Sequence, residues 1–327
     1  MARTPGLANA LAGGPGYATL QAIGLVRTPK LSGVNIDREL QKRGIGTATP
    51  KGLGALSEAE RARSVVVVQD AFTSYYETAL LLDLLDLIQT LGLRPWLAPY
   101  RPNGKALHVH GFLGTFERAA AANAAMLQEF AATGVELVGL DPSMTLTYRS
   151  EYPAALGANG LPAVSLVQEW LAQHREALPV IGGGTEYQLL PHCTERTTAP
   201  AALRDWPSVF STCGLRLTIL PSGCCGMAGT WGHEAEHRAT SEHIYSLSWA
   251  AHVAAARTSG TLLADGYSCR SQAKLIDNVE LSHPVQALLT AIRDVNNAQG
   301  RRESTPRGVD TATLHQTRIA SEAAQKG

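Results

Sequence analysis

The chain has 327 residues, which is enough for two domains of ordinary size. Its residues are 45% hydrophobic and 17% charged, and its formal net charge of zero argues against binding to nucleic acid or to an acidic membrane surface. The longest apolar candidate for a membrane span, Ala79 to Leu93, is interrupted by Asp83 and Asp86. The N-terminus lacks the apolar core of a signal peptide. We therefore expect a cytoplasmic protein, with peripheral attachment at the inner membrane face left open.

The first 158 residues divide into an irregular part and a regular part. Residues 1–62 are rich in Gly, Pro, Ala and Thr without sustained periodicity, which predicts a linker or N-terminal extension with one or two short helices. Residues 63–158 then alternate between short apolar runs and helical patterns. The predicted strands are Ser64–Gln69, Arg94–Ala98 and Val135–Leu140, and the predicted helices cover about 74–91 and 115–132.

The second half repeats this alternation. Residues 180–298 contain predicted strands at Tyr187–Leu190, Arg216–Leu220 and Thr261–Ala264, whereas residues 299–327 form a polar tail that we expect to be disordered. Strands that alternate with helices are typical of parallel pairing through crossover helices. The sequence therefore predicts an α/β fold of two pseudo-repeated domains with mainly parallel sheets.

The two halves also match as sequences. Gly92–Pro99 matches Gly214–Pro221 at an offset of 122 residues, which places Ala71 on Cys193 and Pro102-Asn103-Gly104 on Cys224-Cys225-Gly226. At an offset of 125 residues, Asp141–Met144 falls on Gly266–Cys269. The chain is therefore predicted to be a duplication in which only the second copy keeps the cysteines.

All five cysteines lie between Cys193 and Cys269, which favours a site over scattered packing residues. Cys193, the pair Cys224-Cys225 and Cys269 each follow a predicted strand, and parallel strands bring such positions to one edge of the sheet. Four thiolates suit an iron–sulfur cluster or tetrahedral zinc. Cys213, at the end of a helical stretch, is predicted to be a packing residue.

Several strings resemble a known family. They are Val68–Ser74, Gly139–Pro142, Leu190–Glu195, Gly223–Gly229 and Gly266–Gln272. Over about residues 20–297 they resemble the CCG, or cysteine-rich, domain of heterodisulfide reductase and the glycolate oxidase iron–sulfur subunit. The chain is still more similar to the C-terminal region of bacterial FAD-linked, iron–sulfur D-2-hydroxyglutarate dehydrogenase-like proteins.

The resemblance implies that the four cysteines ligate an iron–sulfur cluster, most simply [4Fe–4S], within an FAD-dependent 2-hydroxy-acid oxidoreductase acting on a CH–OH group. The cluster would pass electrons from a flavin to an electron acceptor. No FAD-binding region and no ferredoxin-type cysteine run is found in this chain, so the flavin is expected on a partner subunit or on a missing N-terminal region.

Two alternatives remain open. The wider family often ends its motif with Cys-x-x-Cys, whereas Cys269 is followed by Arg270, Ser271 and Gln272, which keeps a structural zinc or scaffold module possible. His233–His237 also matches the H-E-x-x-H pattern of zinc proteases, with Glu234 as the general base. That interpretation ranks lower because Thr240 replaces the glycine of the extended pattern and no methionine follows.

Further residues are candidates for contact with the cofactor. His192 and Glu195 flank Cys193. They are predicted to influence the properties of the cluster through contacts with its ligands. Arg270 and Gln272 follow Cys269 and are predicted to hydrogen-bond a cluster sulfur or an anionic substrate, and His233 is predicted to approach the cluster. In the cysteine-free repeat, Asp70, Asp141, Arg149 and Glu151 are interpreted as helix-capping residues.

Overall fold

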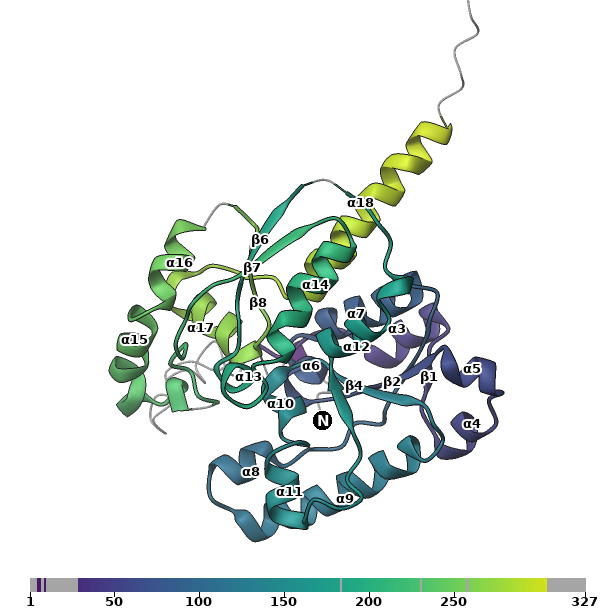
Figure 1. The fold of residues 1–327 in the computed structure, drawn as a ribbon. Coiled ribbons are helices and arrows are strands. Elements are labelled where there is room, and N and C mark those ends of the chain that lie inside the picture. Colours follow the sequence, from purple (N-terminus) through teal and green to yellow (C-terminus); the bar gives the residue numbers. More distant parts are fainter. Residues whose placement is uncertain are drawn as a thin grey trace, which may run out of the picture. The chain divides into compact units, whose positions relative to one another are not determined.

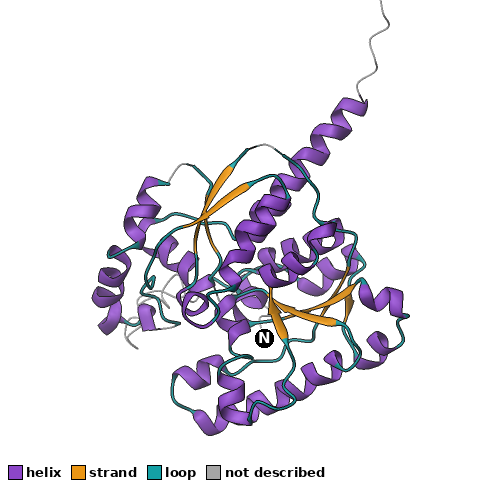
Figure 2. Cartoon of the chain, in the orientation of Figure 1, coloured by secondary structure: helices purple, strands orange, loops and turns teal. Residues whose placement is uncertain are grey.

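The chain forms an α/β fold in which all strand pairs of the described residues are parallel (Figures 1 and 2). The computed structural model describes residues 5, 6, 9, 29–182, 184–229, 231–256 and 259–304. They belong to two compact units, 1–289 and 290–327, and the described part of the second unit is the C-terminal portion of one helix. The predicted fold class is confirmed.

The first sheet has five strands in the order β1-β3-β2-β4-β5. Its strands are β1 (Gly46–Thr47), β2 (Ser64–Val68), β3 (Arg94–Leu97), β4 (Glu136–Gly139) and β5 (Val164–Leu166). The helices that accompany it are α3 (Ile36–Arg43), α4 (Pro50–Gly54), α5 (Glu58–Ala62), α6 (Ala71–Tyr75), α7 (Thr78–Thr90), α8 (Lys105–Val109), α9 (Leu113–Ala131), α10 (Pro142–Leu146), α11 (Glu151–Leu156), α12 (Val167–Gln173) and the 3₁₀ turn η1 (Arg175–Ala177).

The second sheet has three strands in the order β7-β6-β8. Its strands are β6 (Glu186–Leu190), β7 (Arg216–Ile219) and β8 (Leu262–Ala264). Its helices are α13 (Cys193–Thr198), α14 (Asp205–Thr212), α15 (Arg238–Ser246), α16 (Trp249–Ala255), α17 (Tyr267–Asp277) and α18 (Pro284–Ser304), with 3₁₀ turns η2 (Ala202–Arg204), η3 (Trp231–His233) and η4 (Ala235–His237).

The two sheets share one register. Ser64 of β2 lies opposite Arg94 of β3, and Glu186 of β6 lies opposite Arg216 of β7, which are the same positions shifted by the sequence offset of 122. On the other side, Val68 pairs with Gly139 as Leu190 pairs with Ala264. The sequence repeat is therefore a repeat of strand order and hydrogen-bonding register.

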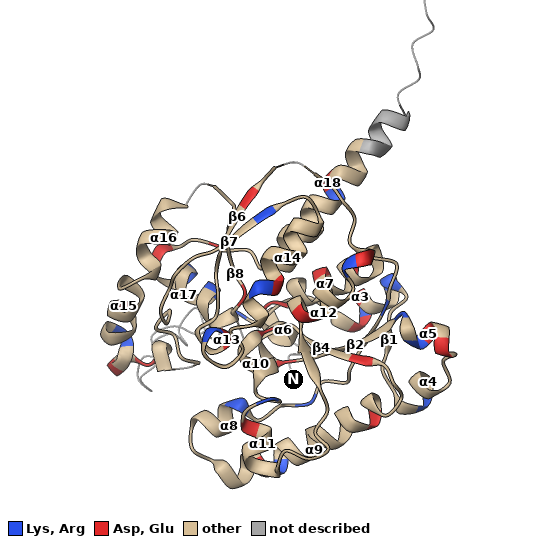
Figure 3. Cartoon of the chain, viewed as in Figure 1, with Lys and Arg blue, Asp and Glu red and all other residues tan. Residues whose placement is uncertain are grey.

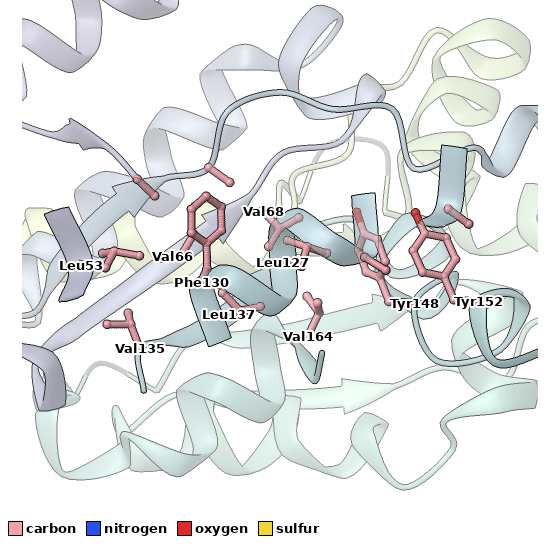
Figure 4. Packing of buried hydrophobic residues seen from close by; sticks show 14 of the residues in the cluster. Leu53, Val66, Val68, Leu127, Phe130, Val135, Leu137, Tyr148, Tyr152 and Val164 are labelled. Atoms are coloured by element: carbon pink, nitrogen blue, oxygen red, sulfur yellow. The ribbon is translucent and has the colours of Figure 1, made fainter. Parts of the chain in front are cut away.

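The first sheet packs its helices through a continuous apolar core (Figure 4). Figure 4 shows Phe130 and Leu127 of α9 beside Val66 of β2 and Leu137 of β4. Helix α7 buries leucines and an isoleucine along most of its length, which explains why its sequence is apolar almost all round. Each such buried leucine contributes roughly 1.5–3 kcal/mol.

Some boundaries differ from the predictions. The helix expected over about 74–91 is two helices, α6 and α7. The first is separate because the Asp70 side chain caps it, accepting hydrogen bonds from the N–H groups of Phe72 and Thr73. Strand β5 was not predicted. In the segment expected to be an N-terminal extension, β1 pairs with β3 at the sheet edge. Helix α18 extends to Ser304, and the rest of the tail predicted to be disordered lies outside the described residues.

Candidate metal centre

Four cysteines meet at the carboxyl edge of the second sheet. Cys193 begins α13 just after β6, Cys224 and Cys225 lie in the loop that follows β7, and Cys269 lies in the first turn of α17 after β8. Since the three strands run parallel, their carboxyl ends lie at one edge, as the sequence predicted. Cys193 and Cys269 belong to helix N-termini, and only the cysteine pair is in a loop.

The four thiols form a chain of neighbours. Cys224 hydrogen-bonds through its side chain to Cys193 and to Cys225, and Cys225 does the same to Cys269. None of the cysteines is in a disulfide. Hydrogen bonds from Cys193 and Cys225 hold the pKa of Cys224 well below its usual range, whereas the hydrogen bond to Cys224 raises the pKa of Cys193 and of Cys225. Of these three thiols, Cys224 thus ionises most easily.

The thiols differ in exposure. Cys225 and Cys269 belong to the apolar core of the second sheet, where they are 2% and 0% exposed. Cys193 and Cys224 are half-buried, so this side of the group faces outward. The centre is therefore dry on one side and reachable on the other, a setting in which burial and hydrogen bonding tune a bound metal.

Backbone N–H groups point at the sulfurs. The amide of Gly226 donates to Sγ of Cys224 at 3.3 Å, and the amides of Thr194 and Met227 donate to Cys193 and Cys225. Gly226 has a φ of +85°, and a Cβ atom there would lie 2.2 Å from the carbonyl oxygen of Ser241. Glycine is thus required for the backbone to pass this point and present both thiols.

His192 and Glu195 hold the Cys193 segment from behind. The His192 amide donates to Oδ1 of Asp265 at 2.8 Å, and Nδ1 of its ring accepts from Thr194 N at 3.2 Å. Glu195 is fully buried beside Gln168 and Asp265, and burial together with the charge of Asp265 raises its pKa well above the ordinary value. Their hydrogen-bond partners are backbone, amide and carboxyl groups, so a direct contact to the sulfurs stays a prediction.

Arg270 and Gln272 both have protein partners, and a contact of either side chain with a cluster sulfur or a substrate stays a prediction. Arg270 pairs with Glu77 of the first repeat, with Nε and Oε1 3.1 Å apart, and donates to the carbonyls of Ala264 and Asp265. Gln272 donates to Oγ of Ser241 at 2.8 Å, directly behind Gly226. Both side chains thereby fix backbone segments next to cysteines.

The H-E-x-x-H segment does not form the helix that its pattern requires. It lies in the 3₁₀ turns η3 and η4, with Glu234 extended between them at ψ 134°. The ligand atoms of Glu234, Glu236 and His237 approach within 4.8 Å of one another, but His233 is buried elsewhere, in the wall of a cavity that Arg270 also lines. The two histidines therefore do not share the helix face on which a zinc protease depends.

Buried carboxyl groups around the centre were missed from the sequence. Asp265 directly follows β8, at the position where the first repeat has Leu140, and it is 1% exposed. The sequence did offer a signal for this residue. A charged side chain stands directly after an apolar strand, at a position that is apolar in the other copy. Asp265 binds the His192 amide and hence positions the residue that precedes Cys193.

The equivalent place in the first repeat is filled by side chains. Asn103 and Met144 stand at the positions of Cys225 and Cys269, and Nδ2 of Asn103 lies 3.5 Å from Sδ of Met144. Ala71 replaces Cys193. The duplicated edge therefore keeps its geometry while offering an amide and a thioether in place of thiols. Asp70 and Asp141 cap α6 and α10 as predicted, whereas Arg149 and Glu151 pair with Glu169 and Lys105.

Basic and acidic residues are interspersed along the described chain (Figure 3). In the part of the chain that the structure describes, no helix combines the length and the apolar character needed to cross a bilayer.

Known proteins resemble the chain over most of its length. It is 46% identical over 292 residues to D-2-hydroxyglutarate dehydrogenase of Pseudomonas putida and 41% identical over 298 residues to that of Escherichia coli. These matches cover 88% and 90% of the chain but only 28% and 29% of the relatives, so the chain spans little more than a quarter of their length. No model of a protein family matches the chain.

Two more distant proteins are also similar. One is a component of the anaerobic glycerol-3-phosphate dehydrogenase of Escherichia coli, which is 25% identical over 253 residues, covering 73% of the chain and 61% of that component. A solved structure of a hypothetical protein from Helicobacter pylori aligns with a TM-score of 0.42 and 11% identity, over 89% of this chain and 58% of that one.

Proposed function

We propose that this chain ligates an iron–sulfur cluster through Cys193, Cys224, Cys225 and Cys269 and carries electrons for an FAD-dependent 2-hydroxy-acid dehydrogenase. The observation that carries the proposal is the contact chain of four thiols at one sheet edge. Thiolates are the ligands of iron–sulfur clusters, and N–H groups directed at the sulfurs are among the features that set their reduction potential.

The fit of these residues to a cluster rests on the donor set. The centre offers sulfur atoms, and backbone amides of Thr194, Gly226 and Met227 can stabilise the negative charge of a sulfur cluster. Cys225 and Cys269 would hold the cluster on its buried side and Cys193 and Cys224 on its open side. When bound, the group would accept and release single electrons, while the chain fixes its position and excludes water from one face.

The oxidoreductase role and the substrate class are supported by the relatives. Relatives that are 46% and 41% identical are named D-2-hydroxyglutarate dehydrogenase, and a more distant one is a component of anaerobic glycerol-3-phosphate dehydrogenase. Because the chain matches little more than a quarter of the longer enzymes, the flavin that would oxidise the hydroxy acid is assigned to the rest of such a protein or to a partner subunit.

Anaerobic reconstitution with iron and sulfide tests the metal assignment. The loaded chain should absorb broadly near ~400 nm and bleach with dithionite, as expected for thiolate-bound iron. Cys225→Ser should lose this absorbance, whereas Cys213→Ser, which alters a buried cysteine of the same chain outside the group, should keep it. An unchanged spectrum in Cys225→Ser contradicts the proposed ligand set.

A structural zinc is the second candidate, favoured by the same four thiols because tetrahedral sulfur sites also bind zinc. One equivalent of zinc in a colourless protein, with no iron uptake, would replace the first proposal by this one. A protease function is not proposed, since the H-E-x-x-H segment lacks the helix that would bring its histidines together.

A further inference from the structure

A carboxylate of the cysteine-free repeat caps the helix that carries Cys269. Oδ2 of Asp141 accepts a hydrogen bond from the amide of Tyr267, the first residue of α17, at 2.9 Å. Oδ1 of the same carboxylate accepts from the amides of Ser143 and Met144 in α10, at 3.0 and 3.1 Å. Gly266, the N-cap of α17, has no side chain to do this, and one buried acid therefore serves both helices.

A second contact from the first repeat reaches the residue next to Cys269. Glu77 pairs with Arg270 through both carboxylate oxygens, and the same guanidinium donates to the carbonyls of Ala264 and Asp265 at 2.8 Å each. The side chain of Arg270 is only 5% exposed and that of Glu77 is 27% exposed, so the guanidinium end of this bidentate pair is shielded from water. It links the end of β8 and the first turn of α17 to the first repeat.

Aromatic packing completes the contact. Phe72 stacks on Tyr267 with ring centroids 4.3 Å apart and an interplanar angle of 16°. Three kinds of interaction from the first repeat, a charged cap, an ion pair and a ring stack, thus converge on residues 267–270 around Cys269. Helix α13, which begins at Cys193, also packs against α10 of the first repeat, but the described residues show no hydrogen bond, ion pair or ring stack between that helix and the first repeat.

We propose that Asp141 and Glu77 are positioning residues, through which the cysteine-free repeat holds the Cys269 ligand and lowers the reduction potential of the bound cluster. This inference rests on the proposed metal centre. The N–H groups of the first helical turn have no partners within the helix, so the α17 N-terminus depends on an external acceptor. A buried negative charge nearby also disfavours the added electron, because screening by water is weak there.

Asp141→Asn tests the role of the cap, and Asp70→Asn is the matched control. Asp70 is also a buried N-cap, but in the described residues its hydrogen bonds all stay within the first repeat. With iron-loaded protein, we expect Asp141→Asn to release iron to a chelator about tenfold or more faster than wild type. Mutation of residues that orient metal ligands typically lowers metal affinity by at least this factor. Its midpoint potential should rise. Asp70→Asn should release iron at nearly the wild-type rate.

Glu77→Gln keeps the inference testable if Asp141→Asn fails to fold, since Glu77 is 27% exposed and tolerates an isosteric amide. It should raise the potential and speed iron release, because Arg270 would lose its counter-charge. Wild-type potential and release rate in Glu77→Gln and in any folded Asp141→Asn would overturn the inference while leaving the metal centre intact. If the wild-type chain takes up zinc and no iron, the proposed function fails, and zinc release from the same variants tests the positioning role.

Discussion

Replacement of Gly226 by alanine is the sharpest structural test of the cysteine loop. The residue has a φ of +85°, in the left-handed region, where a side chain costs roughly 1–2 kcal/mol. An added Cβ would lie 2.2 Å from the backbone oxygen of Ser241, a contact that no side-chain rotation relieves. Forced overpacking of this kind costs about 1–3 kcal/mol. We therefore expect Gly226→Ala to lower the free energy of unfolding by about 2–5 kcal/mol.

Gly229 provides the matched control, because its φ is +72° but nothing lies within 4 Å of an added Cβ. Gly229→Ala should cost only the conformational part, roughly 1–2 kcal/mol. Urea unfolding of the metal-free proteins, followed by circular dichroism, measures both values without a contribution from bound metal. The difference between the two variants isolates the collision with Ser241.

The same variant should impair metal binding. Gly226 follows the cysteine pair, donates to Sγ of Cys224, and accepts at its carbonyl from Oγ of Ser241 at 2.8 Å. A displaced residue 226 would move both thiols, so Gly226→Ala should bind less iron than Gly229→Ala after equal reconstitution. Equal unfolding free energies and equal iron contents in the two variants would refute the reasoning.

Three other predictions concern a buried carboxyl group, the H-E-x-x-H segment and a tightly packed glycine. Burial and the charge of Asp141 raise the pKa of Asp70 to about 7, so ionisation of Asp70 should lower the free energy of unfolding as the pH rises from about 4 to 7. Over that range, the free energy of unfolding of Asp70→Asn should rise by a few kcal/mol relative to that of wild type. Parallel pH profiles of the two proteins would contradict this. Glu234→Gln should leave metal content unchanged by elemental analysis, and a loss would restore the zinc-protease motif. Gly266→Ala, whose Cβ would lie 2.3 Å from Cδ2 of His192, should destabilise the chain in urea by about 1–3 kcal/mol, and an unchanged midpoint would show that His192 is free to move.

The duplicated sheet could be read from the sequence because its signals are local and repeated. Apolar runs bounded by turns predicted six of the eight described strands to within one residue and missed β1 and β5, and the offsets of 122 and 125 residues, which predicted a duplication, match the shared register. The grouping of the four cysteines followed from a general property of parallel sheets, whose strand ends meet at one edge. Cys213 was separated from the group because it precedes a helix-ending glycine, and it is buried as expected.

The direction of side chains around the centre depended on the tertiary structure. Arg270 directly follows Cys269 in sequence, but a helix turns by about 100° per residue, so the two side chains face different partners. Arg270 meets Glu77, which lies 193 residues away, and no spacing rule connects the two. The H-E-x-x-H pattern failed for the related reason that it specifies a site only on a helix, and the chain makes two 3₁₀ turns there.

The sequence by itself thus determined which cysteines come together and which sheet edge presents them, because strand periodicity and the internal repeat are properties of short segments. Only the tertiary structure decided what the cysteine-free copy does at that edge. Asp141 and Glu77 reach the Cys269 helix because the two copies pack against each other, and such packing depends on the shapes and charges of surfaces that are assembled after the strands and helices have formed.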